Sequence, residues 1–145
     1  MAVDIKAAIP HRDPFLLLDD ILELSPDRVK AKVTLRPDHP LWKQVYSGHY
    51  PGNPITPGVL LLEIMFQAAG VLLAGQGAAG VPVVTRVREV KFRRLVRPGD
   101  CLEVEAVLKE KLANAFYLAG KAWVGGEVAC QAEFTLALVA EERQL

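Results

Sequence analysis

The sequence has few cysteines and no excess of either charge. Its 145 residues include two cysteines, and 17 basic residues balance 17 acidic ones. A net charge of zero argues against a general nucleic-acid binder, which would need a basic surface. Cys101 and Cys130 do not have the spacing of a C-x-x-C metal site. Each lies in a strand-like segment, where a buried free thiol is expected.

We expect neither a secretory signal nor a membrane span. Residues 1–6 do not combine a basic and an apolar stretch as a signal peptide does. The apolar run 59–74 is shorter than the roughly 20 residues that cross a bilayer, and it contains Glu63 and Gln67. There are no internal repeats or low-complexity linkers. We therefore expect one cytoplasmic domain over residues 1–145, with neither nucleic acid nor membrane as its partner.

Apolar residues alternate with polar ones in several segments, which predicts strands. In residues 28–35, for example, the side chains of Val29, Ala31, Val33 and Leu35 share one face. Short connections containing Gly, Pro or Asn separate successive strands, so antiparallel neighbours are expected. The other strand-like runs are residues 15–24, 83–96, 101–112, 115–124 and 127–139.

One long helix is expected between the second and third strands. Thr56 is its predicted N-cap, Pro57 its first residue, and Gly75 or Gly77 marks its end. Residues 36–56, which precede it and contain four prolines, are expected to be irregular. Because the helix is apolar nearly all round, it must be surrounded. The sequence therefore predicts an α+β fold in which a curved antiparallel sheet wraps around one long central helix, the outline of the hotdog fold.

The segment 48–58, GHYPGNPITPG, contains three prolines and three glycines. These residues restrict the backbone to an unusual path, so His49 would be held in one orientation. The alternative is a Pro- and Gly-rich connector with an incidental histidine. A fixed histidine is a candidate general base.

Glu63 and Gln67 are the strongly polar residues of the apolar helix, and their spacing of four places them on one face. Burying a carboxylate is costly unless it is paired, protonated or beside a cavity. Burial would favour the protonated form and make Glu63 a proton donor, with Gln67 orienting it. The alternatives are a solvated stripe at the sheet edge, a hydrogen bond between the two, or an ordinary buried glutamine.

Gly58 lies in the first turn of this helix, where backbone N–H groups have no partner within the helix. Glycine lets a ligand approach the backbone, so Gly58 is a candidate oxyanion donor. A base, an acid and an oxyanion donor together suit an elimination next to a carbonyl. His49 would remove a proton from the carbon beside a thioester, and Glu63 would protonate the departing hydroxyl.

Residues 48–67, GHYPGNPITPGVLLLEIMFQ, closely resemble the GHFPGxPIxPGVLxxExMxQ-like motif of the β-hydroxyacyl-acyl carrier protein dehydratases of bacterial fatty-acid synthesis, the FabZ type. Tyr50 replaces a phenylalanine of the motif. Residues 9–19, IPHRDPFLLLD, and 91–100, KFRRLVRPGD, are similar to two further segments of that family. The resemblance thus covers nearly the whole chain in the family's order.

The resemblance implies a hotdog fold and dehydration of a 3-hydroxyacyl thioester on acyl carrier protein to the trans-2-enoyl thioester. It also implies a homodimer, often assembled as a trimer of dimers. His49 would come from one subunit and Glu63 from the other, with an apolar tunnel for the acyl chain and no metal or organic cofactor. The related FabA type has aspartate at the position of Glu63 and often cysteine at Val59, so this chain is more similar to the simple dehydratases.

The chain departs from the family pattern at residues 36–47, which look longer and less apolar than usual and would reshape the substrate entrance. His11 is expected to make a structural hydrogen bond, and His39 to be exposed. Residues 86–97 contain six basic side chains and one acidic residue, Glu89. They would either dock the acidic acyl carrier protein or form a solvated strand face balanced by acids elsewhere.

Two other functions fit parts of the pattern. A hotdog acyl-CoA thioesterase could use Glu63 to direct water, but it would not need His49. A non-catalytic subunit that binds acyl carrier protein would not need to keep both residues.

Overall fold

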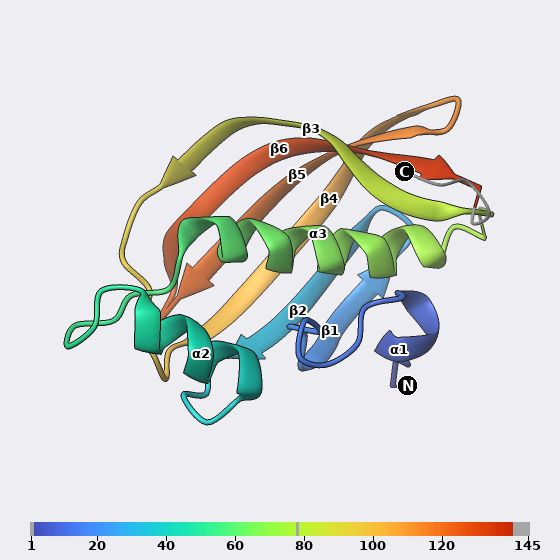
Figure 1. Cartoon of the computed structure of the whole chain (residues 1–145). Coiled ribbons are helices and arrows are strands. Elements are labelled where there is room, and N and C mark those ends of the chain that lie inside the picture. The colour runs from blue at the N-terminus through green and yellow to red at the C-terminus, as the bar shows by residue number, and fades with distance from the viewer. Residues whose placement is uncertain (1, 78, 141–145) are drawn as a thin grey trace.

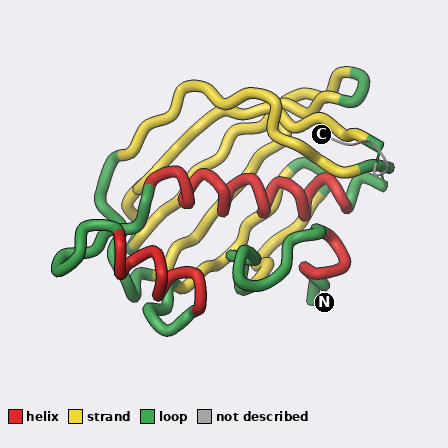
Figure 2. The backbone as a smooth tube through the Cα atoms, viewed as in Figure 1, coloured by secondary structure: helices red, strands yellow, loops and turns green. Residues whose placement is uncertain are grey.

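The computed structural model describes residues 2–77 and 79–140 (Figure 1). A six-stranded antiparallel sheet, with strand order β1-β2-β4-β5-β6-β3, curves around helix α3, as the sequence predicted. Figure 2 shows α3 lying along the inside of the curved sheet. The helices are α1 (Ile5–Ala8), α2 (Pro40–Gly48) and α3 (Gly58–Ala74); the strands are β1 (Asp20–Ser25), β2 (Arg28–Thr34), β3 (Val81–Phe92), β4 (Cys101–Leu112), β5 (Ala115–Val124) and β6 (Glu127–Val139).

The core lies between α3 and the concave face of the sheet. The side chains at alternate positions of β2 and of the residue after it were predicted to share one face. This prediction is confirmed, because all of them are at most 1% exposed: Val29, Ala31, Val33 and Leu35. The helix comes so close to the sheet at Gly120 that an added Cβ would lie 2.9 Å from a methionine sulfur of α3. This close packing buries α3 over most of its surface.

The first strand is shorter than predicted. It begins at Asp20, and residues 15–18 precede the sheet, which the chain reaches at Asp19, whose N–H donates to the Lys32 carbonyl of β2 at 3.1 Å. The Gln67 side chain makes hydrogen bonds with the backbone of residues 15–18: it accepts from Leu17 N–H and donates to the Phe15 carbonyl. A buried side chain therefore satisfies polar backbone groups that a neighbouring strand would otherwise satisfy.

Helix α2 lies in the stretch that was predicted to be irregular, and the short α1 was not expected either. His39 caps α2 by accepting from Leu41 N–H at its Nδ1, 3.2 Å away, so it is half-buried rather than exposed. Trp42 and Tyr46, four residues apart, are both buried and their rings stack at 5.8 Å. Helix α2 thus packs against the rest of the protein through two of its own aromatic side chains.

Strand β3 lies at one edge of the sheet and pairs with β6. Antiparallel neighbours were predicted correctly for β1–β2, β4–β5 and β5–β6, but β3 and β4 are not neighbours. The connection between them crosses the end of the sheet, where the Val96 carbonyl accepts from Thr56 N–H at 2.7 Å. It therefore passes the beginning of α3.

Helix α3 ends as predicted, with Gly75 as its C-cap, but it begins one residue later than predicted. Pro57 is the N-cap and Gly58 the first residue, because the Thr56 hydroxyl bonds to Tyr46 instead of capping the helix. No helix in the described ranges is long and apolar enough to cross a membrane.

The two cysteines differ in exposure. Cys130 is buried, as expected, and desolvation raises the pKa of its thiol to about 11. Cys101 was also expected to be buried but is exposed. It is the first residue of β4 and faces away from the core, whereas the next residue, Leu102, faces inward.

Candidate active site

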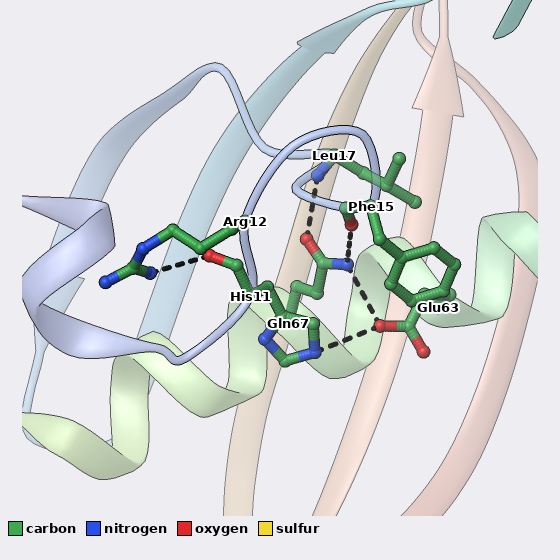
Figure 3. A network of polar contacts seen from close by, with 6 residues as sticks. All are labelled: His11, Arg12, Phe15, Leu17, Glu63 and Gln67. Carbon is green, nitrogen blue, oxygen red and sulfur yellow. Dashed lines mark hydrogen bonds and ion pairs between the residues drawn. The ribbon is translucent and has the colours of Figure 1, made fainter. Parts of the chain in front are cut away.

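Glu63 lies in α3 with two nitrogen atoms beside its carboxylate (Figure 3). Its Oε2 accepts from Gln67 Nε2 at 3.0 Å and lies 3.4 Å from His11 Nε2. The Glu63 side chain is 21% exposed, so it is reachable from solvent while held from two sides. Glu63 and Gln67 share one helix face, as predicted, and the hydrogen bond between them that was considered as an alternative is present.

Gln67 is fully buried and makes three hydrogen bonds. Its Oε1 accepts from Leu17 N–H at 2.9 Å, and its Nε2 donates to the Phe15 carbonyl at 2.8 Å as well as to Glu63. Because an N–H must face an acceptor and a carbonyl must face a donor, these backbone groups fix the orientation of the amide. Gln67 therefore always presents a donor to the Glu63 carboxylate.

His11 contacts the proposed acid, which the sequence did not predict. Its ring stacks near Phe15 at 6.3 Å, and its buried Nδ1 has no hydrogen-bond partner among the described residues. The Nε2 faces Glu63, so a proton on that nitrogen would be donated to the carboxylate. The sequence feature that could have indicated this contact is the position of His11 within residues 9–19, which resemble a segment of the family.

A cavity of about 230 Å³ opens beside Glu63. His11 and Glu63 supply polar atoms to it, and the rest of its wall is mainly apolar. That combination fits a ligand with an apolar chain and a polar reacting group. The apolar lining includes Ile9, Phe66, Gly70, Val83, Val84 and Leu136.

His49 is held at both its backbone and its ring. It is the C-cap of α2, with its N–H donating to the Val45 carbonyl at 2.8 Å. Its Nδ1 lies 2.8 Å from the Ile55 carbonyl. A carbonyl only accepts, so this contact assigns a proton to Nδ1 and leaves Nε2 of the neutral ring free to act as a base. The next residue, Tyr50, has φ 58°, so the chain turns sharply there.

Gly58 begins α3 against the ring of Phe92. A Cβ at this position would lie 2.6 Å from that ring, so a larger residue would have to displace the exposed Phe92 side chain. In the described part of the chain the Gly58 N–H has no hydrogen-bond acceptor. An N–H without a partner in the first turn of a helix is what a candidate oxyanion donor requires.

The structure brings some of the predicted site residues together and separates others. Glu63 and Gln67 are in direct contact, whereas no hydrogen bond or ion pair joins His49 to Glu63 within the described chain. His49 is also absent from the lining of the cavity beside Glu63. A single chain thus presents the acid and the base separately.

Several basic side chains of residues 86–97, the basic cluster, contact acidic or amide side chains. Arg88 lies 3.3 Å from Glu133, and Arg93 donates to Gln131 at 3.0 Å. Arg97 donates to Asn53 in the His49 loop at 2.9 Å. Exposed contacts of this kind are screened by solvent and weak.

The chain is similar to known proteins in sequence and in fold. The FabA-like domain family matches residues 9–133. The 3-hydroxyacyl-[acyl-carrier-protein] dehydratase FabZ of Symbiobacterium thermophilum is 43% identical over 134 residues, covering 90% of this chain and 92% of its own length. The FabZ dehydratase of Petrotoga mobilis is 38% identical, covering 93% and 95%. In fold, the chain is similar to the dehydratase heterocomplex ApeI:P of Xenorhabdus doucetiae, with a TM-score of 0.84, 19% identity, and coverage of 97% and 94%.

Proposed function

Because the chain belongs to the FabA-like family, as a 3-hydroxyacyl-[acyl-carrier-protein] dehydratase of the FabZ type, we propose that His49, Glu63 and Gly58 form its catalytic site. The enzyme has the hotdog fold and removes water from a 3-hydroxyacyl thioester in fatty-acid biosynthesis. The observation that carries the assignment is the Glu63 carboxylate, which is held by Gln67 and His11 and lines a mainly apolar cavity.

In the proposed mechanism His49 Nε2 takes a proton from the carbon beside the thioester. The electron pair of that C–H bond forms the new carbon–carbon double bond. The C–O bond at the next carbon breaks, and Glu63 gives its proton to the departing hydroxyl, which leaves as water. The Gly58 N–H stabilises the negative charge that develops on the thioester oxygen. Gln67 keeps the carboxyl group in place.

We further propose that the complete site forms between two protomers, with His49 from one and Glu63 from the other. The separation of these residues within one chain supports this arrangement. So does β3, an edge strand with several exposed apolar side chains, which antiparallel pairing with a second copy would cover. They are Val84, Val87 and Phe92, followed by Leu95. A trimer of such dimers is the larger assembly we expect.

The substrate arrives on acyl carrier protein, in the proposed scheme at the basic cluster of β3 and the connection after it. The acyl chain then occupies the apolar cavity beside Glu63. The reaction takes place in the cytoplasm, consistent with two cysteines that remain free.

Subunit mixing tests the composite site directly. His49→Ala and Glu63→Gln should each abolish formation of the 2-enoyl absorbance from a 3-hydroxyacyl carrier substrate. When the two variants are coexpressed equally, half of the dimers are mixed and each has one intact site, so about a quarter of the activity should return. Failure to recover activity in mixed dimers of demonstrated composition would mean that each site is built from one chain.

Two substitutions serve as matched controls. His39→Asn keeps a side chain that can cap α2, and Glu23→Gln changes an exposed carboxylate on β1. Both should retain enoyl formation. Release of free thiol without enoyl product would instead support thioester hydrolysis, and neither product would support a binding role.

A further inference from the structure

The hydroxyl groups of Tyr46 and Thr56 form a buried hydrogen bond, with their oxygen atoms 2.8 Å apart. Tyr46 is 8% exposed and Thr56 is 5% exposed. Thr56 stands where a hydroxyl commonly caps a helix, but α3 has no side-chain cap. Its hydroxyl is directed to α2 instead, so this bond links the end of one helix to the beginning of the next.

Both partners are anchored on their far sides. The Tyr46 ring stacks on Trp42, which is 1% exposed, and the Thr56 N–H donates to the Val96 carbonyl at 2.7 Å. Burial raises the pKa of Tyr46, so its phenol stays protonated and able to donate. The bond therefore joins two fixed points of the fold.

These fixed points are adjacent to the groups that hold His49. Val45, whose carbonyl accepts from the His49 N–H, precedes Tyr46. Ile55, whose carbonyl lies 2.8 Å from the His49 Nδ1, precedes Thr56. Without the Tyr46–Thr56 bond, one of these carbonyls would be free to move relative to the other. Gly58, two residues beyond Thr56, would be free to move as well.

We propose that Tyr46 and Thr56 are positioning residues for the dehydration. Their hydrogen bond closes the loop that carries His49, fixes the ring through the Ile55 carbonyl, and sets the position of the Gly58 N–H. This inference rests on the proposed role of His49 as the base. Neither hydroxyl takes part in a chemical step, because each already bonds to the other in the protein interior.

The kinetic test uses Tyr46→Phe and Thr56→Val, which remove one hydroxyl each with little change of shape. We expect each to lower kcat about tenfold with less change in KM, because small displacements of a catalytic group reduce rates steeply. The double variant should be no slower than the slower single variant, since both remove the same bond. Thr56→Ser, which keeps a hydroxyl, should retain most of the activity.

Nitrogen-15 spectra of the histidine rings give a second measurement that a purely structural role would leave unchanged. The chain has three histidines, and His49→Ala assigns the signal. The native ring should be in the Nδ1-protonated form, and Tyr46→Phe should give a mixture of both tautomers. Tyr117→Phe, which removes a hydroxyl from the outer face of β5, is the control and should change neither measurement.

Unchanged kcat and an unchanged His49 tautomer in Tyr46→Phe would overturn the proposal. If that variant unfolds, the comparison of Thr56→Val with Thr56→Ser decides, and equal activities would also overturn it. Full activity of His49→Ala would defeat the catalytic assignment of that histidine. The tautomer measurement would still show whether the Tyr46–Thr56 bond orients the ring.

Discussion

Replacing Gln67 with leucine should destabilise the protein through the backbone groups that this side chain satisfies. Gln67→Leu leaves the Leu17 N–H and the Phe15 carbonyl without their partner and removes one donor from Glu63. A buried polar group that loses its partner costs about 1–3 kcal/mol. Since the Phe15 carbonyl is only partly buried, we expect a total near 3 kcal/mol, or a fall in Tm of about 9 °C.

Thermal and denaturant unfolding measure this change, and the enoyl assay measures the effect on Glu63. Gln67→Leu should also lower kcat, because the carboxyl group loses its orienting donor. Gln131→Leu is the matched control: Gln131 has one exposed side-chain hydrogen bond, to Arg93, and its loss should cost less than about 0.5 kcal/mol. A Gln67→Leu protein within 1 kcal/mol of the native stability would refute the account of this network.

Three further predictions concern other parts of the molecule. Gly120→Ala should destabilise the protein by about 2 kcal/mol, because its Cβ would meet a methionine sulfur at 2.9 Å, whereas Gly48→Ala, with nothing within 4 Å, should be nearly neutral in the same unfolding assay. The folded-state pKa of Cys130, about 11, exceeds its ordinary value of 9.0, so the stability that it contributes below pH 9 should be lost as the pH rises toward 11. Cys130→Ala should flatten the measured fall in this range, and an equally steep fall would contradict the prediction. His11→Phe should lower kcat more than it changes KM, since it removes the second nitrogen beside Glu63; an unaltered kcat would show that this contact is only structural.

The sequence predicted the elements whose pattern is local and repetitive. Alternation in β4, β5 and β6 gave their bounds, and the apolar run gave α3 and its end at Gly75. The order of strands in the sheet was less accessible. Nothing within β3 itself reveals that it pairs with β6 rather than with the strand that follows it. Helix α2 was missed because the prolines and glycines of residues 36–56 suggested a loop, and only two residues of the helix are buried.

The same distinction applies to the site. Spacing along one helix predicted the contact between Glu63 and Gln67, because residues four apart must be neighbours. The contact between His11 and Glu63 joins residues 52 positions apart, so it depends on the whole fold. The orientation of the His49 ring depends on the path of the loop to Ile55, which no periodic pattern encodes.

The double anchoring of the His49 loop also bears on where this chain can change in length. An added residue between Tyr46 and Thr56 would have to be accommodated by a loop tied at both ends and at the histidine ring. An added residue before His39 would lengthen only the connection that leads into α2. The position of the His49 loop relative to α2 would not change. Engineered insertions that alter the substrate entrance should therefore be placed ahead of α2, where the geometry of the catalytic loop does not depend on the number of residues.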